Sequence, residues 1–286
     1  MTLEKNQQGP EVVKLQQTLL ALGYPLPRWG ADGSFGRETR AALARLFAEH
    51  GRAFDADAGA VSDEELAFVY SLQRSLGRDI PLPVPPERFF DLRVQAGLAH
   101  DYGLRPWSKV TGVCLHQTAC VLGEKPERWA TVGAHLGITR GGKVIFLHDF
   151  DRLIVHGNGW NTECVGIELD GMYAGIEGDL RTFWQPAGQP KLQPQSPTPD
   201  LVEAAKATIH WIKAVVESHG GDLKALVAHR QASKERQSDP GSALWQQVAI
   251  PLHEELALTD GGIGFKLGTG YPIPESWDAR CKGISY

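Results

Sequence analysis

The sequence has no apolar run of the length that a signal peptide or a membrane-spanning helix needs, and its N-terminal segment, MTLEKNQQGPEVVKL, is largely polar. A signal peptide carries about 7–15 consecutive apolar residues, and a transmembrane helix about 20. We therefore expect a protein made in the cytoplasm without a signal peptide and without a transmembrane segment. If its target lies outside the cytoplasm, another route must deliver or release it.

Cysteine is scarce, and basic residues are not in excess. The four cysteines, at positions 114, 120, 164 and 281, lack the paired C-x-x-C spacing of a zinc ribbon and are expected to be reduced. The 29 basic and 34 acidic side chains give a formal charge of −5. Nucleic-acid binding needs clustered lysine and arginine, so no nucleic-acid partner is expected. What is present, 42% apolar and 22% charged residues, predicts a packed globular core.

The first 76 residues are predicted to form a small three-helix bundle. Apolar residues recur at helical spacing over 12–22, ending at Gly23, and again over 37–50. A third helix is predicted over 62–76, opened by Ser62 with Glu65 three residues later, which is a capping-box pattern. Residues 77–90, GRDIPLPVPPERFF, contain four prolines and are predicted to be a linker, because proline cannot continue a helix.

Residues 91–286 change to a pattern of short β-branched or apolar runs separated by helical stretches. The runs are TGVCLH, HLGITR, KVIFLH, CVGIEL and ALVAH, and Gly141–Gly142 separates the second and third as a hairpin turn would. The longest helix is predicted over 199–220, with proline at its start and glycine at its end. This pattern predicts an α/β domain with a mixed β-sheet flanked by helices.

Three of these predicted strands deliver His116, Glu168 and His229, and Asp239 follows ten residues after His229. A catalytic zinc site takes three protein ligands of this kind and keeps one position open. His116, His229 and Asp239 could supply that set and leave Glu168 as a base. Each residue also has a structural interpretation, because strand-end histidines are often structural, an aspartate before Pro-Gly often caps a turn, and Glu168 could pair with an arginine. Spacing alone does not decide between these interpretations.

Five sequence segments, in order across roughly residues 90 to 260, decide it by resemblance. They are VTGVCLHQTA, GAHLGITRGGKVIFL, VHGNGWN, VGIELDG and the His-Arg loop that ends in Asp-Pro-Gly. This pattern resembles the zinc-dependent N-acetylmuramoyl-L-alanine amidases, whose fold is shared by peptidoglycan recognition proteins. The resemblance implies that Zn²⁺ is bound by His116, His229 and Asp239 and that Glu168 is the general base. It further implies that His156 and Asn158 line the cleft and that His135 lies beside the metal, as a supporting residue or a substrate contact. Trp160, which follows these cleft residues closely in the sequence, is a candidate for contacting a sugar ring or the stem peptide.

One position departs from the family pattern. Amidases of this family often carry a lysine two residues before the aspartate ligand, whereas this sequence has Gln237 there, next to Arg236. Three explanations remain open for oxyanion stabilisation: Arg236 turns in, Gln237 donates a neutral hydrogen bond, or the zinc ion acts largely alone. Losing one such donor costs on the order of 10²-fold in rate.

The N-terminal bundle resembles the three-helix peptidoglycan-binding domain. The matching segments are GPEVVKLQ, ALGY, ADGSFG and ETRAAL, although the glutamine that usually follows the closing Phe47 is replaced by Ala48. Most of these positions have a structural explanation, so the residues that contact glycan are not assigned from the sequence.

Together the resemblances imply a cell-wall hydrolase that cleaves the amide between N-acetylmuramic acid and L-alanine of the stem peptide, with peptidoglycan as its partner. The alternatives are a muropeptide-binding protein without turnover and a zinc peptidase that cuts within the stem peptide. Action on the wall in the periplasm without a signal peptide fits a phage endolysin, or an injected effector, which would be accompanied by an immunity protein. A cytoplasmic muropeptide-recycling enzyme ranks third, because it has no evident use for a wall-binding bundle.

Overall fold

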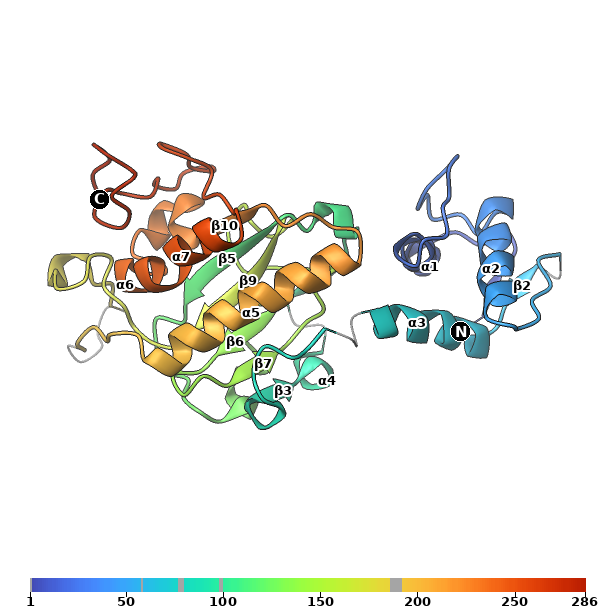
Figure 1. Ribbon diagram of the computed structural model, residues 1–286, viewed down its shortest axis with the longest axis horizontal. Coiled ribbons are helices and arrows are strands. Elements are labelled where there is room, and N and C mark those ends of the chain that lie inside the picture. The colour runs from blue at the N-terminus through green and yellow to red at the C-terminus, as the bar shows by residue number, and fades with distance from the viewer. Residues whose placement is uncertain (1, 58, 77–79, 98–99, 186–191) are drawn as a thin grey trace. The chain divides into compact units, whose positions relative to one another are not determined.

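The structure is a computed structural model that describes residues 2–57, 59–76, 80–97, 100–185 and 192–286. The chain divides into two compact units (Figure 1). The first unit spans Met1–Ile80, and the second contains Pro81–Glu217 and Gly221–Tyr286. Each unit has its own apolar core.

The first unit is the expected helical bundle. Its helices are α1 (Pro10–Ala21), α2 (Arg37–Glu49) and α3 (Asp63–Leu76). A short antiparallel pair, β1 (Leu3–Glu4) with β2 (Ala60–Val61), joins the N-terminal segment to the segment just before α3. The predicted capping box is present, because Glu65 accepts a hydrogen bond from the backbone N–H of Ser62 at 2.7 Å and Ser62 Oγ accepts one from the N–H of Glu65 at 3.3 Å. The apolar stripes of the helices meet in a core that includes Leu15, Leu19, Phe35, Leu43 and Phe47.

The second unit is built on one six-stranded sheet with the order β10-β5-β9-β6-β7-β3. Its strands are β3 (Phe89–Asp91), β5 (Gly112–Gln117), β6 (Leu136–Ile138), β7 (Val144–Phe146), β9 (Cys164–Leu169) and β10 (Ala225–Ala228). Neighbouring strands are parallel except β6 and β7, which form the antiparallel hairpin predicted at Gly141–Gly142. The predicted mixed sheet is therefore confirmed.

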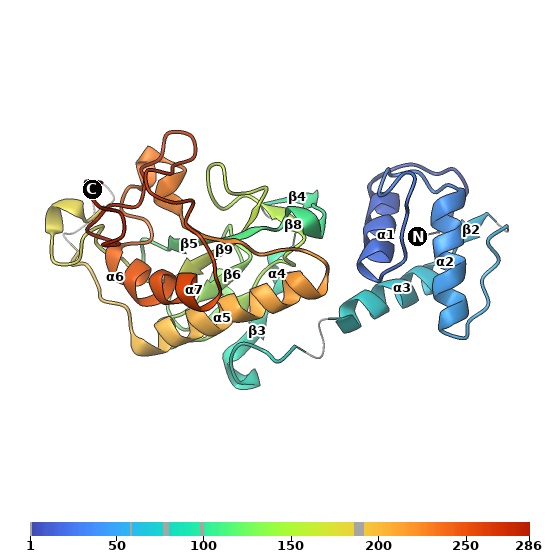
Figure 2. The same ribbon diagram turned by 45° about the horizontal axis from the view of Figure 1, so that its top comes forward.

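The two faces of this sheet carry different kinds of side chains. Alternate residues of β5 and β9, such as Val113, Leu115, Val165 and Ile167, point into the main core, which they share with α5 (Pro199–Ser218). Figures 1 and 2 show this helix lying along the sheet, with α7 (Ile250–Glu255) beside it. Since side chains alternate along a strand, the intervening residues of β5 and β9 point to the opposite face. That second face carries the polar side chains considered below.

Three strands of the second unit were not predicted. Phe89 and Phe90, which the sequence assigned to the linker, belong to β3, where they pair with β7. Their aromatic side chains pack on the domain, which explains why a proline-rich run ends there in a strand. The other two, β4 (Asp101–Leu104) and β8 (Arg152–Ile154), form a separate antiparallel pair. The linker residues 77–79 lie outside the described residues.

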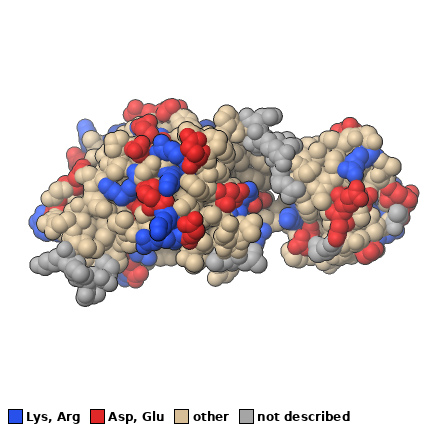
Figure 3. All heavy atoms as spheres, turned by 90° about the horizontal axis from the view of Figure 1, so that it is seen from below, with Lys and Arg blue, Asp and Glu red and all other residues tan. Residues whose placement is uncertain are grey.

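Short helical segments complete the second unit. They are α4 (Arg93–Ala96), α6 (Ser242–Leu244), a π-helical turn (Trp245–Ala249) and 3₁₀ turns at Pro86–Arg88, Trp107–Lys109, Pro126–Trp129, Leu180–Thr182, His229–Gln231 and Lys234–Arg236. Within the described part of the chain, no helix has the length and apolar character to cross a bilayer. Figure 3 shows basic and acidic side chains interspersed on the face in view.

Candidate metal and catalytic site

Three neighbouring parallel strands bring the candidate residues to one edge of the sheet. His116 on β5 is in register with Glu168 on β9, and His229 follows directly after β10. His116 and Glu168 both belong to the alternate positions that point away from α5, so they share one face. Because parallel strands end at the same edge, residues 52 and 61 positions apart in the sequence meet here.

The ligand-type atoms of His116, His229 and Asp239 form a compact group. The Nδ1 atoms of the two histidines are 2.8 Å apart, His229 Nδ1 is 3.0 Å from Asp239 Oδ2, and His116 Nδ1 is 4.0 Å from the same oxygen. All three side chains are buried. Two imidazole nitrogens and one carboxylate oxygen that converge in this way are a donor set that suits zinc.

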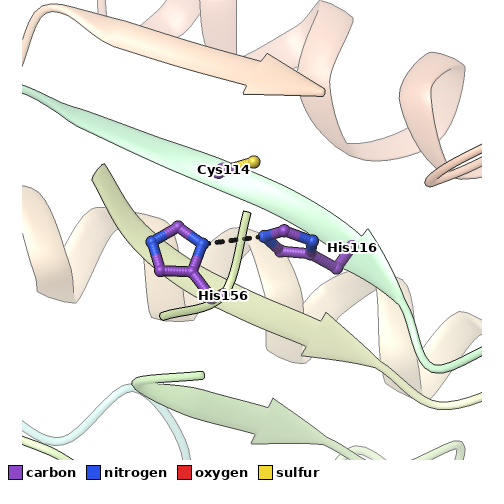
Figure 4. A group of neighbouring side chains, drawn as sticks. All are labelled: Cys114, His116 and His156. Carbon is purple, nitrogen blue, oxygen red and sulfur yellow. Dashed lines mark hydrogen bonds between the residues drawn. The ribbon is translucent and has the colours of Figure 1, made fainter. Parts of the chain in front are cut away.

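The hydrogen bonds of His156 determine which nitrogen of His116 faces this group. His156 Nε2 lies 3.1 Å from the Cys164 carbonyl, which can only accept, so the proton of this ring is on Nε2. Burial lowers the pKa of His156 to about 3, which leaves its Nδ1 as an acceptor for His116 Nε2–H at 3.0 Å (Figure 4). Gly166 on β9 provides the room for the His156 ring, because a Cβ there would collide with it.

His116 is therefore held with a lone pair on Nδ1. Burial, followed by the neighbouring His229 and His156, lowers the pKa of His116 well below its ordinary value, so its ring is neutral. Two ring nitrogens 2.8 Å apart repel each other unless a proton or a cation lies between them. The residues present thus fit a bound metal ion at the His116, His229 and Asp239 group.

A second group of ligand-type side chains consists of Cys114, His116 and His156, whose ligand atoms lie within 4.8 Å of one another. Figure 4 shows the two rings directed at one another from β5 and from the loop that carries His156. In this group His116 Nε2 and His156 Nδ1 already share a proton, and burial raises the pKa of the Cys114 thiol well above its usual value. The group that contains Asp239 is therefore the better metal site.

Gln117 anchors Asp239, although no sequence motif predicted this role. Its backbone N–H donates to Asp239 Oδ1 at 2.9 Å, and its side-chain amide donates to the Ser238 carbonyl at 2.8 Å. Its side-chain oxygen accepts from the Tyr173 N–H at 2.6 Å. With Oδ1 occupied, Asp239 keeps Oδ2 for the metal group. The one available signal was its position directly after His116.

Glu168 lies next to this group with an uncommitted carboxyl oxygen. Its Oε2 is buried and has no hydrogen-bond partner among the described residues. Burial, and then the negative charge of Asp239, raises the pKa of Glu168 well above its ordinary value. An isolated buried carboxyl whose pKa is perturbed is typical of a group that handles protons.

A cavity of about 160 Å³ opens beside these residues. It is lined by Gln117, Thr118, Ala119, His156, Glu168, Trp184, His229, Glu235, Arg236, Ser238 and Asp239. Trp184, 46% exposed, is the aromatic residue in this lining, and the sequence analysis missed it. No local motif marked it, because only the tertiary fold brings the segment after residue 180 to the cavity.

The remaining predicted site residues fall into two groups. His156 and Arg236 line the cavity, whereas His135, Asn158, Trp160 and Gln237 do not. His135 is fully buried behind His156, and its Nδ1 accepts from the Gly166 N–H at 3.0 Å. His135 therefore stabilises the end of the sheet through β9 and does not line the cavity.

Asn158 and Trp160 lie apart from the cavity for different reasons. Asn158 is exposed, and the amide oxygen that holds the His-Gly segment is instead that of Asn161, which accepts from the N–H groups of His156 and Gly157 at 3.0 and 2.8 Å. Trp160 is only 7% exposed and packs in a small cluster with Cys114, Cys164 and Val227. A ring packed in this way has no open face for a sugar.

Gln237 and Arg236 also differ in whether they line the cavity. The backbone carbonyl of Gln237 accepts a hydrogen bond from Arg230 Nη1 at 2.6 Å, which ties this residue to the domain interior. Arg236 is exposed and contributes to the cavity wall. Gln237 is at the position of the family lysine, but its cationic neighbour Arg236 is the residue that lines the cavity.

Comparisons with known proteins agree with this arrangement. A family model described as N-acetylmuramoyl-L-alanine amidase matches residues 106–242, and a model for peptidoglycan binding domains matches residues 8–59. A curated relative, N-acetylmuramoyl-L-alanine amidase CwlL of Bacillus licheniformis, is 35% identical over 86 residues, or 29% of this chain. The match covers 24% of CwlL, so the chain spans about a quarter of that relative.

Two solved structures similar to part of this chain come from Clostridium intestinale and Drosophila. N-acetylmuramoyl-L-alanine amidase LysC from Clostridium intestinale is 12% identical, with a TM-score of 0.42, and the match covers 62% of this chain and 100% of LysC. Drosophila PGRP-LB is 16% identical, with a TM-score of 0.42, and the match covers 61% of this chain and 97% of that protein. The second unit thus contains a region, residues 106–242, that matches the N-acetylmuramoyl-L-alanine amidase family, and the first unit contains a region, residues 8–59, that matches the peptidoglycan binding domain family.

Proposed function

We propose that this protein is a zinc-dependent cell-wall hydrolase that cleaves the amide between N-acetylmuramic acid and L-alanine. The observation that carries the proposal is the convergence of His116, His229 and Asp239 beside Glu168, whose Oε2 has no hydrogen-bond partner in the described part of the chain. Zinc, when bound by these three residues, would polarise the scissile carbonyl and make water nucleophilic at neutral pH. The family matches supply the substrate class.

Residues of the chain then have distinct tasks. His156 fixes the proton of His116 on Nε2, and Gln117 fixes Asp239, so the ligand atoms are oriented in advance. Glu168 accepts a proton from the attacking water and returns it to the leaving nitrogen. Arg236, at the cavity wall, stabilises the negative charge that develops on the carbonyl oxygen.

The first unit would hold the enzyme on its polymer. Attachment to the wall raises the local concentration of the second unit at its substrate. Release through a phage-type membrane lesion, or injection into a rival cell with an immunity protein protecting the producer, would bring the protein to the periplasmic wall. A holin gene or an immunity gene beside the coding sequence distinguishes these two routes.

The test is mass spectrometry of purified peptidoglycan digested with and without a zinc chelator. Free stem peptides that begin at L-alanine, formed only without chelator, are expected. Cuts within the stem peptide would instead identify a peptidase. Intact peptidoglycan that sediments with the protein would identify a binding protein without turnover.

Glu168→Gln isolates the role of the base. We expect it to lower kcat by about 10²–10⁴-fold while zinc remains bound, because the change keeps the side-chain volume and removes the proton-accepting group. Glu163→Gln is the matched control, since Glu163 is an exposed residue just before β9. Full turnover by the Glu168→Gln variant would remove Glu168 from the mechanism.

A further inference from the structure

The first unit has an exposed tryptophan at the edge of a large cavity. Trp29 is 61% exposed, although its neighbours in the bundle bury most of their apolar side chains. The cavity beside it has a volume of about 640 Å³, within the range of small-molecule sites. It is lined by Gln8, Gln16, Arg28, Asp32, Ser34 and Arg37, among others.

The loop that presents Trp29 is tied to α2. Glu38, in the first turn of that helix, accepts hydrogen bonds from the backbone N–H groups of Arg28 at 2.9 Å and of Trp29 at 3.1 Å. The Arg28 guanidinium lies over the Trp29 ring, 5.0 Å from its centroid. The indole is thus presented on anchored backbone, and most of its surface stays accessible despite the arginine.

A buried amide organises the polar part of the cavity wall. Gln16 is 1% exposed, and its Nε2 donates to Asp32 Oδ1 at 2.8 Å and to Thr39 Oγ1 at 3.0 Å. Its Oε1 accepts from the Gly33 N–H at 2.8 Å. These bonds span the turn that carries the Asp-Gly-x-Phe-Gly motif and fix the polar groups that face the cavity. Fixed polar groups together with an aromatic ring are the usual composition of a ligand site.

The charges around the cavity are balanced. Arg28 and Arg37 are matched by Asp32 and Glu38, and both donors and acceptors are available. Such a wall favours an uncharged ligand with many hydroxyl and amide groups over a peptide that carries several carboxylates. The apolar C–H face of a sugar ring also suits the electron-rich face of an indole.

We propose that Trp29 and this cavity bind an N-acetylated sugar ring of a glycan strand. This inference rests on the proposed function only in taking its ligand from peptidoglycan. It places wall attachment on the sugar backbone rather than on the stem peptide. The first unit would therefore remain attached after the second unit has removed the peptides.

The test measures binding of the full chain to peptide-free glycan strands and to intact peptidoglycan. Trp29→Ala is expected to weaken both by about tenfold or more, as removal of a central tryptophan commonly does, whereas Trp29→Phe retains most of the affinity. Leu20→Ala is the matched control, because Leu20 is an apolar residue of the same unit, 42% exposed, and is absent from the cavity lining. Unchanged thermal unfolding of the Trp29→Ala variant verifies that it is folded.

Two results would overturn the proposal. One is wild-type binding of both polymers by the Trp29→Ala variant. The other is binding by the wild-type protein of intact peptidoglycan but not of peptide-free strands, which would make the stem peptide the ligand. Turnover of a soluble muramyl peptide by the wild-type protein is measured in parallel. Absence of that turnover in the wild type would refute the proposed amidase function and leave the glycan-site result standing.

Discussion

Arg230 connects the loop that carries His229 and Asp239 to the C-terminal segment, and its replacement is the most informative perturbation of the second unit. This arginine directly follows His229 in the sequence, and its side chain is fully buried. Its Nη1 donates to the Gln237 carbonyl at 2.6 Å and its Nε to the Pro272 carbonyl at 3.2 Å. Its guanidinium carbon lies 4.7 Å from the Trp277 ring centroid and 4.8 Å from that of Tyr286.

The energetic effect of Arg230→Met follows from these contacts. Two hydrogen bonds from a charged donor contribute about 3–6 kcal/mol, and the aromatic contacts add about 1–2 kcal/mol. Burial of the guanidinium, which lowers its pKa from 12.5 to about 10, offsets about 3 kcal/mol of this. We therefore expect the free energy of unfolding to fall by about 1–5 kcal/mol. Zinc affinity should fall by about 10–100-fold, because the loop supplies both His229 and Asp239.

The assay combines thermal unfolding, with and without zinc, and zinc competition against a chromophoric chelator. Lys234→Met is the matched control, because Lys234 is an exposed cation of the same loop. Arg230→Lys should recover part of the zinc affinity, since one amine can replace one of the two hydrogen bonds. If Arg230→Met keeps wild-type stability and wild-type zinc affinity, the contacts of Arg230 do not hold this loop.

Further predictions address the ligand support, the cavity wall and the core. His156→Phe should weaken zinc binding by about 10–100-fold in the same chelator competition, since His116 loses the acceptor that fixes its ring; unchanged affinity would contradict this assignment. Arg236→Met should lower kcat by about 10²-fold with little change in KM, whereas Gln237→Ala should have a small effect, and the reverse order would favour Gln237. Gly137→Ala should reduce the urea midpoint through a loss of about 1–3 kcal/mol, because its Cβ would collide with the Trp129 ring; an unchanged midpoint would show that the ring can move.

Much of the secondary structure follows from local sequence signals. The apolar periodicity over 12–22 and 37–50 predicts helices that begin and end within a few residues of α1 and α2. The run CVGIEL coincides with β9, and the run TGVCLH is displaced from β5 by one residue. These signals suffice because each element buries one stripe or face, and burial imposes the period on the sequence. Pairs such as β4 with β8 were missed because they are short and have no alternation of their own.

The sequence by itself determined the residue types that can bind a metal and the strands that deliver them. It also determined the order of the five segments on which the amidase resemblance depends. Only the tertiary structure decided which side chains face the cavity. It separates Arg236 from Gln237 and brings in Trp184, while Trp160 packs into a core cluster. The physical reason is that a strand's period gives the face of a residue, whereas the direction of a loop side chain depends on long-range contacts such as those of Arg230 and Gln117.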